Sequence, residues 1–363
     1  MPKSEAPSVL VVGAGPVGLT AALELARRGA RVRVVDKNES RTGLSKAAGI
    51  NARALEILEP SGVARQLIDA GLKIRRANLR YRGRILATID FANLSHRHDF
   101  LLALPQSDTE AILEDALAPL GVTVERTTEL IDFVQDDGGV TARLGAGGRD
   151  ATHRADYLVG ADGAHSTVRG ILGLGFAGQK YADTWSLADI DMEWPHGDGE
   201  ANLLMNPDGT VLFVISFGGG RFRAITNSGR ALDLLPAGSD VGKVVWETEF
   251  TVSLRQVESY QKGRVFVCGD AAHIHSPAGG RGMNLGIEDA AVLAEKMVSG
   301  GLEGFTAERH PIGARVVRES DLQFRIAALN NPLARGARNA VLRTLVRRPS
   351  FQRRFLRRMA GLV

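Results

Sequence analysis

Residues 9–37 constrain the fold of this chain more than any other stretch. A short apolar run, suited to a strand buried on both faces, leads into three glycines with the spacing G-x-G-x-x-G, at Gly13, Gly15 and Gly18. A helical stretch with apolar side chains on one face follows, and a second apolar strand ends at Asp36. This order predicts a parallel strand–helix–strand unit of the Rossmann type.

Each of these residues has a physical role in binding a dinucleotide. Gly13 allows the sharp turn, Gly15 lets a pyrophosphate approach the backbone, and Gly18 lets the helix pack closely on the strand. The helix N-terminus offers unpaired N–H groups and the positive end of its dipole to the phosphates. Asp36 is placed to accept hydrogen bonds from a ribose diol. The pattern favours a dinucleotide site over a chance glycine-rich turn, but it does not distinguish NAD, NADP and FAD.

Length and composition set the class of protein. The 363 residues exceed one ordinary hydrophobic core, which predicts two domains, and the 44% hydrophobic and 24% charged content is ordinary for a soluble globular protein. No apolar run approaches the length needed to span a bilayer, and no signal-peptide hydrophobic region precedes the first strand. The single cysteine, Cys268, excludes an intrachain disulfide and a cysteine-based metal cluster. We expect a cytoplasmic enzyme without a metal.

Positive charge is concentrated at the C-terminal end of the chain. After Asp321 the sequence has ten arginines and no acidic residue, so the overall net charge of +4 comes from this tail. A general role in nucleic-acid binding is therefore poorly supported. Residues 331–348 and 351–363 are expected to be helical, the second with an apolar face opposite its arginines. We favour packing of this face on the body of the protein over contact with a membrane surface or an acidic partner.

The middle of the chain has a different character. Residues 181–254 contain short strand-like runs separated by glycine, proline and asparagine, which predicts an antiparallel sheet inserted between α/β portions. A β-hairpin is expected over residues 74–89, and a later helix has Asp108 as its expected N-cap. Asp189 and Asp191 fall on one side of a proposed strand, where a solvated face and an acid–base role explain them equally well.

Two later stretches narrow the choice of cofactor. In the first, an apolar strand delivers Asp162-Gly163 into a turn that precedes a helix. In the second, residues 263–296, a buried strand ends in Gly269-Asp270, and a glycine-rich loop leads into another helix. Asp270 is placed to bind a sugar-like hydroxyl group. The N-terminus of the second helix can stabilise the negative charge that a reduced flavin develops, so this stretch fits a flavin better than a nicotinamide.

With these motifs the sequence resembles the class A flavoprotein monooxygenases of the para-hydroxybenzoate hydroxylase type, close to their aromatic and polyketide hydroxylases. The resemblance implies an α/β fold: a Rossmann-like FAD-binding domain, an inserted antiparallel β-sheet substrate domain and a helical C-terminus. The implied limits are residues 1–75, 98–180 and 255–330 for the FAD-binding domain, 76–97 and 181–254 for the substrate domain, and 331–363 for the basic helical segment.

The resemblance also implies which residues hold FAD. The glycine turn would grip the pyrophosphate, the backbone near Leu130 would face the adenine, and Asp270 would bind the ribityl chain. The implied cofactor-binding residues are Gly13, Gly15, Pro16, Gly18, Asp36, Lys37, Lys46, Gln106, Leu130, Asp162, Gly163, Gly269, Asp270, Pro277, Gly282, Met283, Asn284 and Leu285.

No catalytic acid or base is identified from the sequence. We expect His273, in the second of the later stretches, to be structural, and His96 and His98 to lie in an exposed loop near a domain crossover. Arg223 matches a recurrent arginine of the family on a strand, for which we favour a structural role.

The reaction implied by the resemblance is a hydroxylation. NAD(P)H, a transient co-substrate without a second complete fingerprint, would reduce FAD, and O2 would add to give a flavin C4a-hydroperoxide that transfers one oxygen to a phenolic or polyketide-like aromatic ring. One alternative is an FAD-dependent oxidase or reductase without oxygen insertion. Another is a flavin-binding module that acts through a partner. The sequence does not identify the substrate, the choice between NADH and NADPH, or the oligomeric state.

Overall fold

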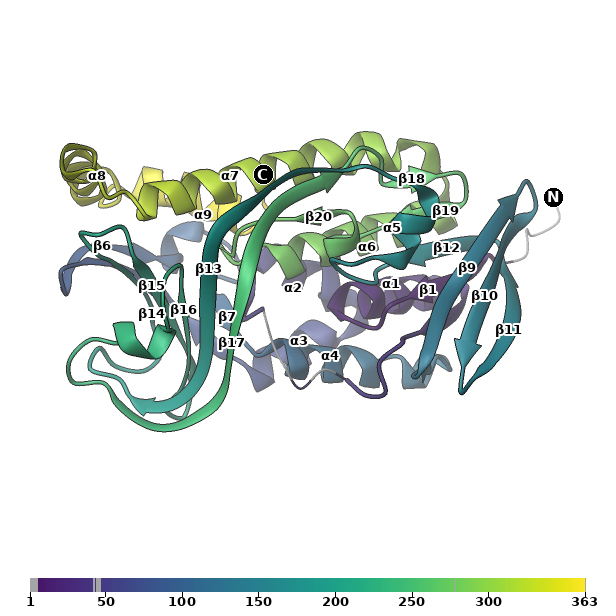
Figure 1. Cartoon of the computed structure of the whole chain (residues 1–363), viewed down its shortest axis with the longest axis horizontal. Coiled ribbons are helices and arrows are strands. Elements are labelled where there is room, and N and C mark those ends of the chain that lie inside the picture. The colour runs from purple at the N-terminus through teal and green to yellow at the C-terminus, as the bar shows by residue number, and fades with distance from the viewer. Residues whose placement is uncertain (1–5, 42, 44–46, 278, 363) are drawn as a thin grey trace.

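The computed structural model describes residues 6–41, 43, 47–277 and 279–362, and the structural statements below refer to these residues. Two large sheets of different character lie side by side, one built around the N-terminal strand and one formed by the middle of the chain (Figure 1). The C-terminal helices run along both of them (Figure 1). The predicted α/β fold, with an inserted, largely antiparallel sheet and a helical C-terminus, is confirmed.

The first sheet is parallel at its centre and carries the glycine turn. β1 (Ser8–Val12) pairs in parallel with β2 (Arg31–Val35) on one side and with β12 (Tyr157–Gly160) on the other. The predicted Rossmann-type unit is therefore present, with α1 (Pro16–Arg27) between β1 and β2. Three short strands extend the sheet: β8 (Val124–Glu125), β19 (Val265–Val267) and β18 (Gln261–Lys262).

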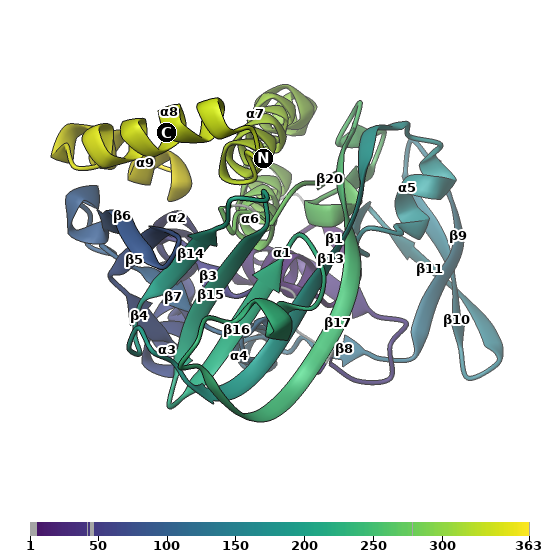
Figure 2. The same cartoon turned by 60° about the vertical axis from the view of Figure 1, so that its left-hand side comes forward.

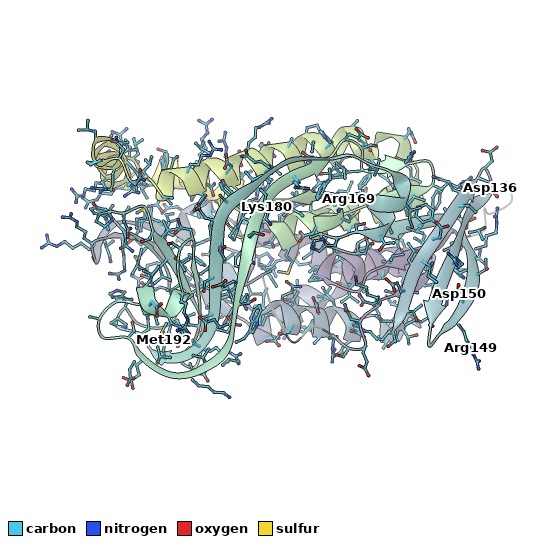
Figure 3. The ribbon with its side chains drawn as sticks, viewed as in Figure 1. Asp136, Arg149, Asp150, Arg169, Lys180 and Met192 are labelled. Atoms are coloured by element: carbon cyan, nitrogen blue, oxygen red, sulfur yellow. The ribbon has the colours of Figure 1, made fainter. Side chains whose placement is uncertain are left out.

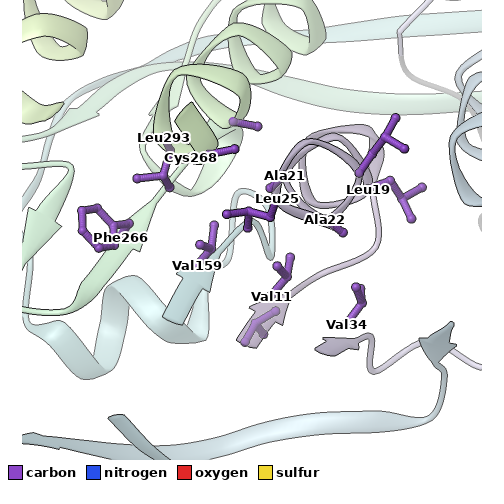
Figure 4. Packing of buried hydrophobic residues seen from close by; sticks show 14 of the residues in the cluster. Val11, Leu19, Ala21, Ala22, Leu25, Val34, Val159, Phe266, Cys268 and Leu293 are labelled. Carbon is purple, nitrogen blue, oxygen red and sulfur yellow. The ribbon is translucent and has the colours of Figure 1, made fainter. Parts of the chain in front are cut away.

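Both faces of this sheet are covered, as the apolar run of β1 predicts. On one face α1 packs beside α6 (Gly282–Ser299), and Figure 4 shows the side chains of Val11 and Val159 among those of the two helices. A three-stranded sheet lies against the other face and is formed by β9 (Thr128–Asp136), β10 (Gly139–Ala146) and β11 (Arg149–Ala155). β11 was not predicted, because it is an edge strand whose residues are polar and mostly exposed.

The second sheet has eight strands in the order β20-β17-β13-β16-β15-β14-β5-β6. β14 pairs with β5 in parallel, and the other neighbours are antiparallel. Its strands are β5 (Arg76–Tyr81), β6 (Arg84–Asp90), β13 (Phe176–Glu193), β14 (Ala201–Met205), β15 (Val211–Gly218), β16 (Arg221–Thr226), β17 (Asp240–Val257) and β20 (His273–Ile274). β5 and β6 form the hairpin that was predicted over residues 74–89.

Strands β13 and β17 connect the two parts of the molecule. Each has 18 residues, and the pair curves from the first sheet to the far end of the second (Figures 1 and 2). The domain limits predicted at residues 180 and 254 fall inside these strands, so the chain passes between the two parts without a break in its secondary structure. A displacement of one part relative to the other must therefore bend this ribbon.

Smaller elements pack beneath the first sheet and lead into the second. A three-stranded sheet contains β3 (Gly49–Ile50), β7 (Leu101–Ala103) and β4 (Leu72–Ile74), and the associated helices are α2 (Ala52–Leu58), α3 (Val63–Ala70) and α4 (Gln106–Asp115). The predicted N-cap of α4, Asp108, is wrong. Pro105 occupies that position with an extended backbone, and Asp108 lies in the first turn, where its charge favours the positive end of the helix dipole.

The C-terminal helices are α7 (Phe305–Ala327), α8 (Pro332–Leu345) and α9 (Pro349–Met359). Figure 2 shows α8 and α9 over the β5–β6 edge of the second sheet. Leu356 of α9 is buried, whereas Arg353, Arg354 and Arg357 are exposed, so this helix packs on the body of the protein with its arginines in solvent. Among the described residues, no helix is long and apolar enough to cross a membrane.

Candidate functional site

The glycine turn after β1 is held by contacts that leave no room for side chains at two of its three positions. A Cβ on Gly13, whose φ is +103°, would lie 2.4 Å from the carbonyl oxygen of Ala161. A Cβ on Gly18 would lie 1.9 Å from the carbonyl oxygen of Gly13. Gly15 differs, because no heavy atom lies within 4 Å of its Cβ position. The protein thus leaves open space at Gly15, at the N-terminus of α1, where a phosphate is stabilised best.

Asp36 is fixed at the end of β2 and faces the same turn. Its Oδ2 accepts a hydrogen bond from the backbone N–H of Ala14 (2.7 Å), and its Oδ1 accepts one from Asn38 (2.8 Å). A carboxylate has about four acceptor positions, so capacity remains for ribose hydroxyls. A cavity of about 220 Å³ opens beside it, and its lining includes the predicted residues Gly13, Gly15, Asp36, Lys37, Leu130, Asp162 and Gly163.

The small cavity also has charged lining residues that were not predicted, among them Arg126 and Glu110. Arg126 lies 4.0 Å from Asp36 and donates a hydrogen bond to Glu114 (2.6 Å). Glu110 is buried, accepts a hydrogen bond from Gln106 (2.8 Å), and has its pKa raised by that burial. Neither residue belongs to a motif with a fixed spacing, and only the fold brings them to Asp36.

A second cavity, of about 1550 Å³, continues from the first. Both are lined by Gly15, Ala161, Gly163 and His165, so they meet at the glycine turn. Eight predicted cofactor-binding residues line the large cavity: Gly15, Pro16, Gln106, Gly163, Asp270, Pro277, Gly282 and Met283. Lys46, also predicted, lies outside the described residues.

Four other predicted residues line neither cavity and contribute to the packing around the site. Gly18 and Gly269 permit close packing, and a Cβ on Gly269 would lie 2.8 Å from a side-chain methyl of Val17. Asn284 and Leu285 are 3% and 2% exposed and do not line either cavity. Their contribution to a cofactor site would therefore come through the backbone of the loop before α6.

Asp162 shapes the turn after β12. Its two carboxylate oxygens accept hydrogen bonds from the hydroxyl of Ser166 (2.5 Å) and the backbone N–H of Val168 (3.1 Å). Ser166 in turn caps α5 (Thr167–Leu172) by accepting from the N–H of Arg169 (2.9 Å). The carboxylate thus orders the loop that carries Gly163 past the glycine turn.

Asp189 is buried, so the solvated face considered for it is wrong, and its carboxylate is engaged in an ion pair. It lies opposite Arg223 across the β13–β16 pair, and the two side chains form a bidentate ion pair with both N–O distances at 2.7 Å. They are 4% and 0% exposed. Arg223 also donates to the carbonyl oxygen of Ala47 (3.0 Å), a residue that lines the large cavity.

The three histidines considered from the sequence, His96, His98 and His273, each lie beside a carboxylate. His273 is buried, and its Nε2 lies 2.6 Å from Asp289, in keeping with the structural role expected for it. The expectation that His96 and His98 are exposed is wrong. His98 is 8% exposed and lies 2.7 Å from Glu59, and His96 is partly buried beside a second glutamate of the α2 region. The crossover loop packs on α2, which a loop-like sequence does not reveal.

Three cations gather where the large cavity meets the β13–β17 ribbon, and we call Arg169, Lys180 and Arg255 the basic edge. All three line the cavity, and none has an ion-pair partner among the described residues. Arg169 donates to the carbonyl oxygens of Ala271 (3.1 Å) and Ala164 (2.8 Å). Burial lowers its pKa, and Arg255 adds to this effect while the charge of Asp162 opposes it. The Arg169 guanidinium lies 3.9 Å from the ring centroid of Phe176 at the start of β13, the strand that carries Lys180, and Figure 3 labels both cations.

The other end of the large cavity is apolar. The rings of Trp185 and Phe324 are 4.8 Å apart, and Phe250 lies 6.2 Å from Trp185. The lining here comes from the second sheet and from the C-terminal helices, and it includes Leu203, Met205, Phe213, Leu342 and Phe355. Such a surface suits a flat apolar molecule.

Comparisons with known proteins give a consistent result. The family described as FAD binding domain matches residues 6–228 and 234–320. The chain is 37% identical over 359 residues to 6-methylpretetramide 4-monooxygenase of Streptomyces rimosus, covering 92% of this chain and 64% of the length of that relative.

Solved structures show the same fold. Anhydrotetracycline hydroxylase OxyS from Streptomyces rimosus has a TM-score of 0.84 and 31% identity, over 98% of this chain and 76% of the other. The p-nitrophenol 4-monooxygenase PnpA from Pseudomonas putida DLL-E4 has a TM-score of 0.91 over 98% of both chains. At 24% identity, that second likeness supports the fold alone.

Proposed function

This chain belongs to the FAD binding domain family, and from that premise we propose that it uses NAD(P)H and O2 to hydroxylate a phenolic or polyketide-like aromatic molecule. The observation that carries the proposal is the continuity of the two cavities at Gly15. One end has open space for phosphates, and the other is an apolar chamber. Relatives named for 6-methylpretetramide and anhydrotetracycline favour a polyketide substrate.

The residues present fit the predicted FAD. The open space at Gly15 and the N-terminus of α1 would receive the pyrophosphate, and Asp36 would bind the adenosine ribose. Further along the same cavity Asp270 would bind the ribityl chain, and Pro277 and the start of α6 would line the ring system. Bound FAD supplies hydride acceptance and oxygen activation, and the protein supplies placement and electrostatics.

The protein's own contribution to oxygen transfer is orientation and exclusion of water. The N-terminus of α6, whose residues Gly282 and Met283 line the large cavity, would stabilise negative charge on the bound ring system. The apolar chamber around Trp185 orients an aromatic substrate and keeps water away from the reacting atoms. No side chain of the chamber is assigned as an acid or base.

The proposal is tested by isotope labelling of the product. The protein loaded with FAD is given NAD(P)H and 18O2 with a panel of phenols and fused-ring polyketides, and products are analysed by mass spectrometry. We expect one labelled oxygen in a hydroxylated product. NAD(P)H consumption that yields only hydrogen peroxide with every compound would instead favour an oxidase or reductase, and absence of NAD(P)H consumption would favour a binding module.

The basic edge is proposed to bind the phosphates of NAD(P)H. Its three cations line the cavity and none of them forms an ion pair with another described residue, and a charge-assisted hydrogen bond contributes about 1.5–3 kcal/mol. Arg255→Ala is therefore expected to raise the KM for NAD(P)H about tenfold, with a smaller rise for Lys180→Ala, whose side chain is more exposed. Steady-state kinetics at two ionic strengths measure this, because salt screening weakens the same interaction.

Arg149→Ala is the matched control for the basic edge. Arg149 is exposed and lies at the right-hand end of the molecule in Figure 3, well away from Lys180. The control should leave the KM unchanged, and the FAD content should be equal in all variants. An unchanged KM in Arg255→Ala would remove the basic edge from the binding site.

A further inference from the structure

Helix α9 contacts both parts of the molecule, and its first half is fastened to the second sheet by Gln352. This residue is 6% exposed. Its side-chain oxygen accepts hydrogen bonds from the backbone N–H of Asp90 (2.8 Å) and the side chain of Asn93 (3.1 Å). Its side-chain nitrogen donates to the carbonyl oxygens of Thr88 (3.0 Å) and Val346 (2.7 Å). An amide has two donors and two acceptor positions, so Gln352 is fully engaged.

The second half of α9 is fastened to the N-terminus of α2. The carbonyl oxygen of Met359 accepts a hydrogen bond from the side-chain nitrogen of Asn51 (3.3 Å), and that of Ala360 accepts one from the N–H of Arg53 (3.2 Å). Asn51 is also the N-cap of α2, since its Oδ1 accepts from the N–H of Ala54 (3.0 Å). The two ends of α9 thus bridge the second sheet and the cofactor-binding part.

From Asn51 the hydrogen bonds continue to the loop that lines the large cavity before α6. The N–H of Asn51 donates to Oδ1 of Asn284 (2.9 Å). The side-chain nitrogen of Asn284 donates to the carbonyl oxygens of Gly280 (2.8 Å) and Gly49 (2.9 Å). A hydrogen-bonded chain therefore joins α9, α2 and the start of α6.

Met359 also touches this loop directly. A Cβ on Gly279 would lie 2.8 Å from the terminal methyl of Met359, and the side-chain nitrogen of Gln323 lies 3.4 Å from the Met359 sulfur. Met359 lines the large cavity together with Phe351, Phe355 and Leu356. The inner side of α9 thus lies between the apolar chamber and solvent.

We infer that α9 is a wall of the active site, which fixes the loop at Gly279–Gly280 and keeps water out of the chamber. This inference rests on the proposed function and extends it, because a loosened wall changes how the reducing equivalents are used. In a closed site NAD(P)H, a proton, O2 and the substrate give NAD(P)+, the hydroxylated product and water. In an opened site NAD(P)H, a proton and O2 give NAD(P)+ and hydrogen peroxide.

The test compares Met359→Ala and Gln352→Ala in the full chain loaded with FAD. The first removes the side chain over Gly279, and the second removes the link to the second sheet. We expect hydrogen peroxide formed per NAD(P)H to rise about threefold or more in both variants. Iodide quenching of the flavin fluorescence, measured without substrate, should rise as well, because the ring becomes accessible to solvent ions.

Two further variants make the result specific to the wall. Met359→Leu conserves side-chain volume and is expected to restore the wild-type values. Arg354→Ala removes an exposed side chain of α9 that lines no cavity, and it should change neither quantity. Equal quenching and equal peroxide yields in Met359→Ala and Arg354→Ala would overturn the inference. If the wild type forms no hydroxylated product but quenching still increases in Met359→Ala, the proposed function is refuted, whereas the inference that α9 shields the cavity from solvent still holds.

Discussion

Replacing Gly15 with alanine is expected to weaken FAD binding at least about 100-fold, or about 2.7 kcal/mol, while the apoprotein keeps its stability. The backbone of Gly15 is extended, with φ −76° and ψ 179°, which alanine adopts without strain. Apart from residue 15 itself and its two chain neighbours, no described protein atom lies within 4 Å of the new Cβ, so the methyl group would meet the ligand. Titration of apoprotein with FAD, followed by flavin fluorescence, measures the affinity, and thermal unfolding of the apoprotein measures stability.

Two other glycine variants separate this effect from general damage. Gly336→Ala, in α8, also has no neighbour near its Cβ position and should change neither property by much. Gly13→Ala should lose both, because its Cβ would overlap the carbonyl oxygen of Ala161 and its φ of +103° strains alanine. If Gly15→Ala binds FAD as tightly as the wild type, the pyrophosphate does not lie at this turn.

The glycine turn and Asp36 could be predicted from sequence because a short segment determines their geometry. The spacing of Gly13, Gly15 and Gly18 indicates that the backbone is approached closely at these positions. At Gly13 and Gly18 the structure agrees, because a Cβ there would overlap a carbonyl oxygen. Gly163 could be predicted in the same way, because its turn is closed by a hydrogen bond between the nearby residues Ser166 and Asp162.

Residues that meet only in the folded chain could not be predicted. Asp189 and Arg223 lie 34 positions apart and become partners through the register of β13 and β16, which no sequence period fixes. The basic edge combines Arg169 with Arg255, which stand on separate elements that the β13–β17 ribbon brings together. A charged residue on a strand has the same sequence pattern whether it is exposed, buried or paired, and only the folded structure distinguishes these cases.

The C-terminal helices show another limit of prediction from sequence. The alternation of apolar and basic residues in α9 indicated an amphipathic helix but not the surface it meets. The residue that fastens it, Gln352, is only 6% exposed, although glutamine side chains are mostly exposed in folded proteins. Its four hydrogen bonds explain the burial, because a fully satisfied amide loses little on leaving water.

Removing Arg223 is expected to cost the folded protein about 3–5 kcal/mol, because it leaves the carboxylate of Asp189 buried without a partner. Asp189 is 4% exposed, so water cannot replace the lost guanidinium. Arg223→Ala should also retain less FAD. The carbonyl oxygen of Ala47 loses its hydrogen bond from Arg223, and the N–H of Ala47 is bonded to Gln106 in the wall of the large cavity (3.2 Å). Guanidinium unfolding and the FAD content of the purified variant measure the two effects.

The double variant Asp189→Leu/Arg223→Met separates the uncompensated charge from the loss of packing. Removing both charges in favour of apolar side chains of similar volume should recover most of the unfolding free energy, since a buried ion pair gains little over apolar packing. The FAD content should stay low, because the hydrogen bond to Ala47 is still missing. Arg230→Ala provides the matched control: that arginine lies in the connection between β16 and β17, is exposed, and pairs with Glu247 of β17 at 2.8 Å, so the variant should unfold as the wild type does. If Arg223→Ala also unfolds at the wild-type midpoint, the buried pair does not hold the second sheet against the cofactor site.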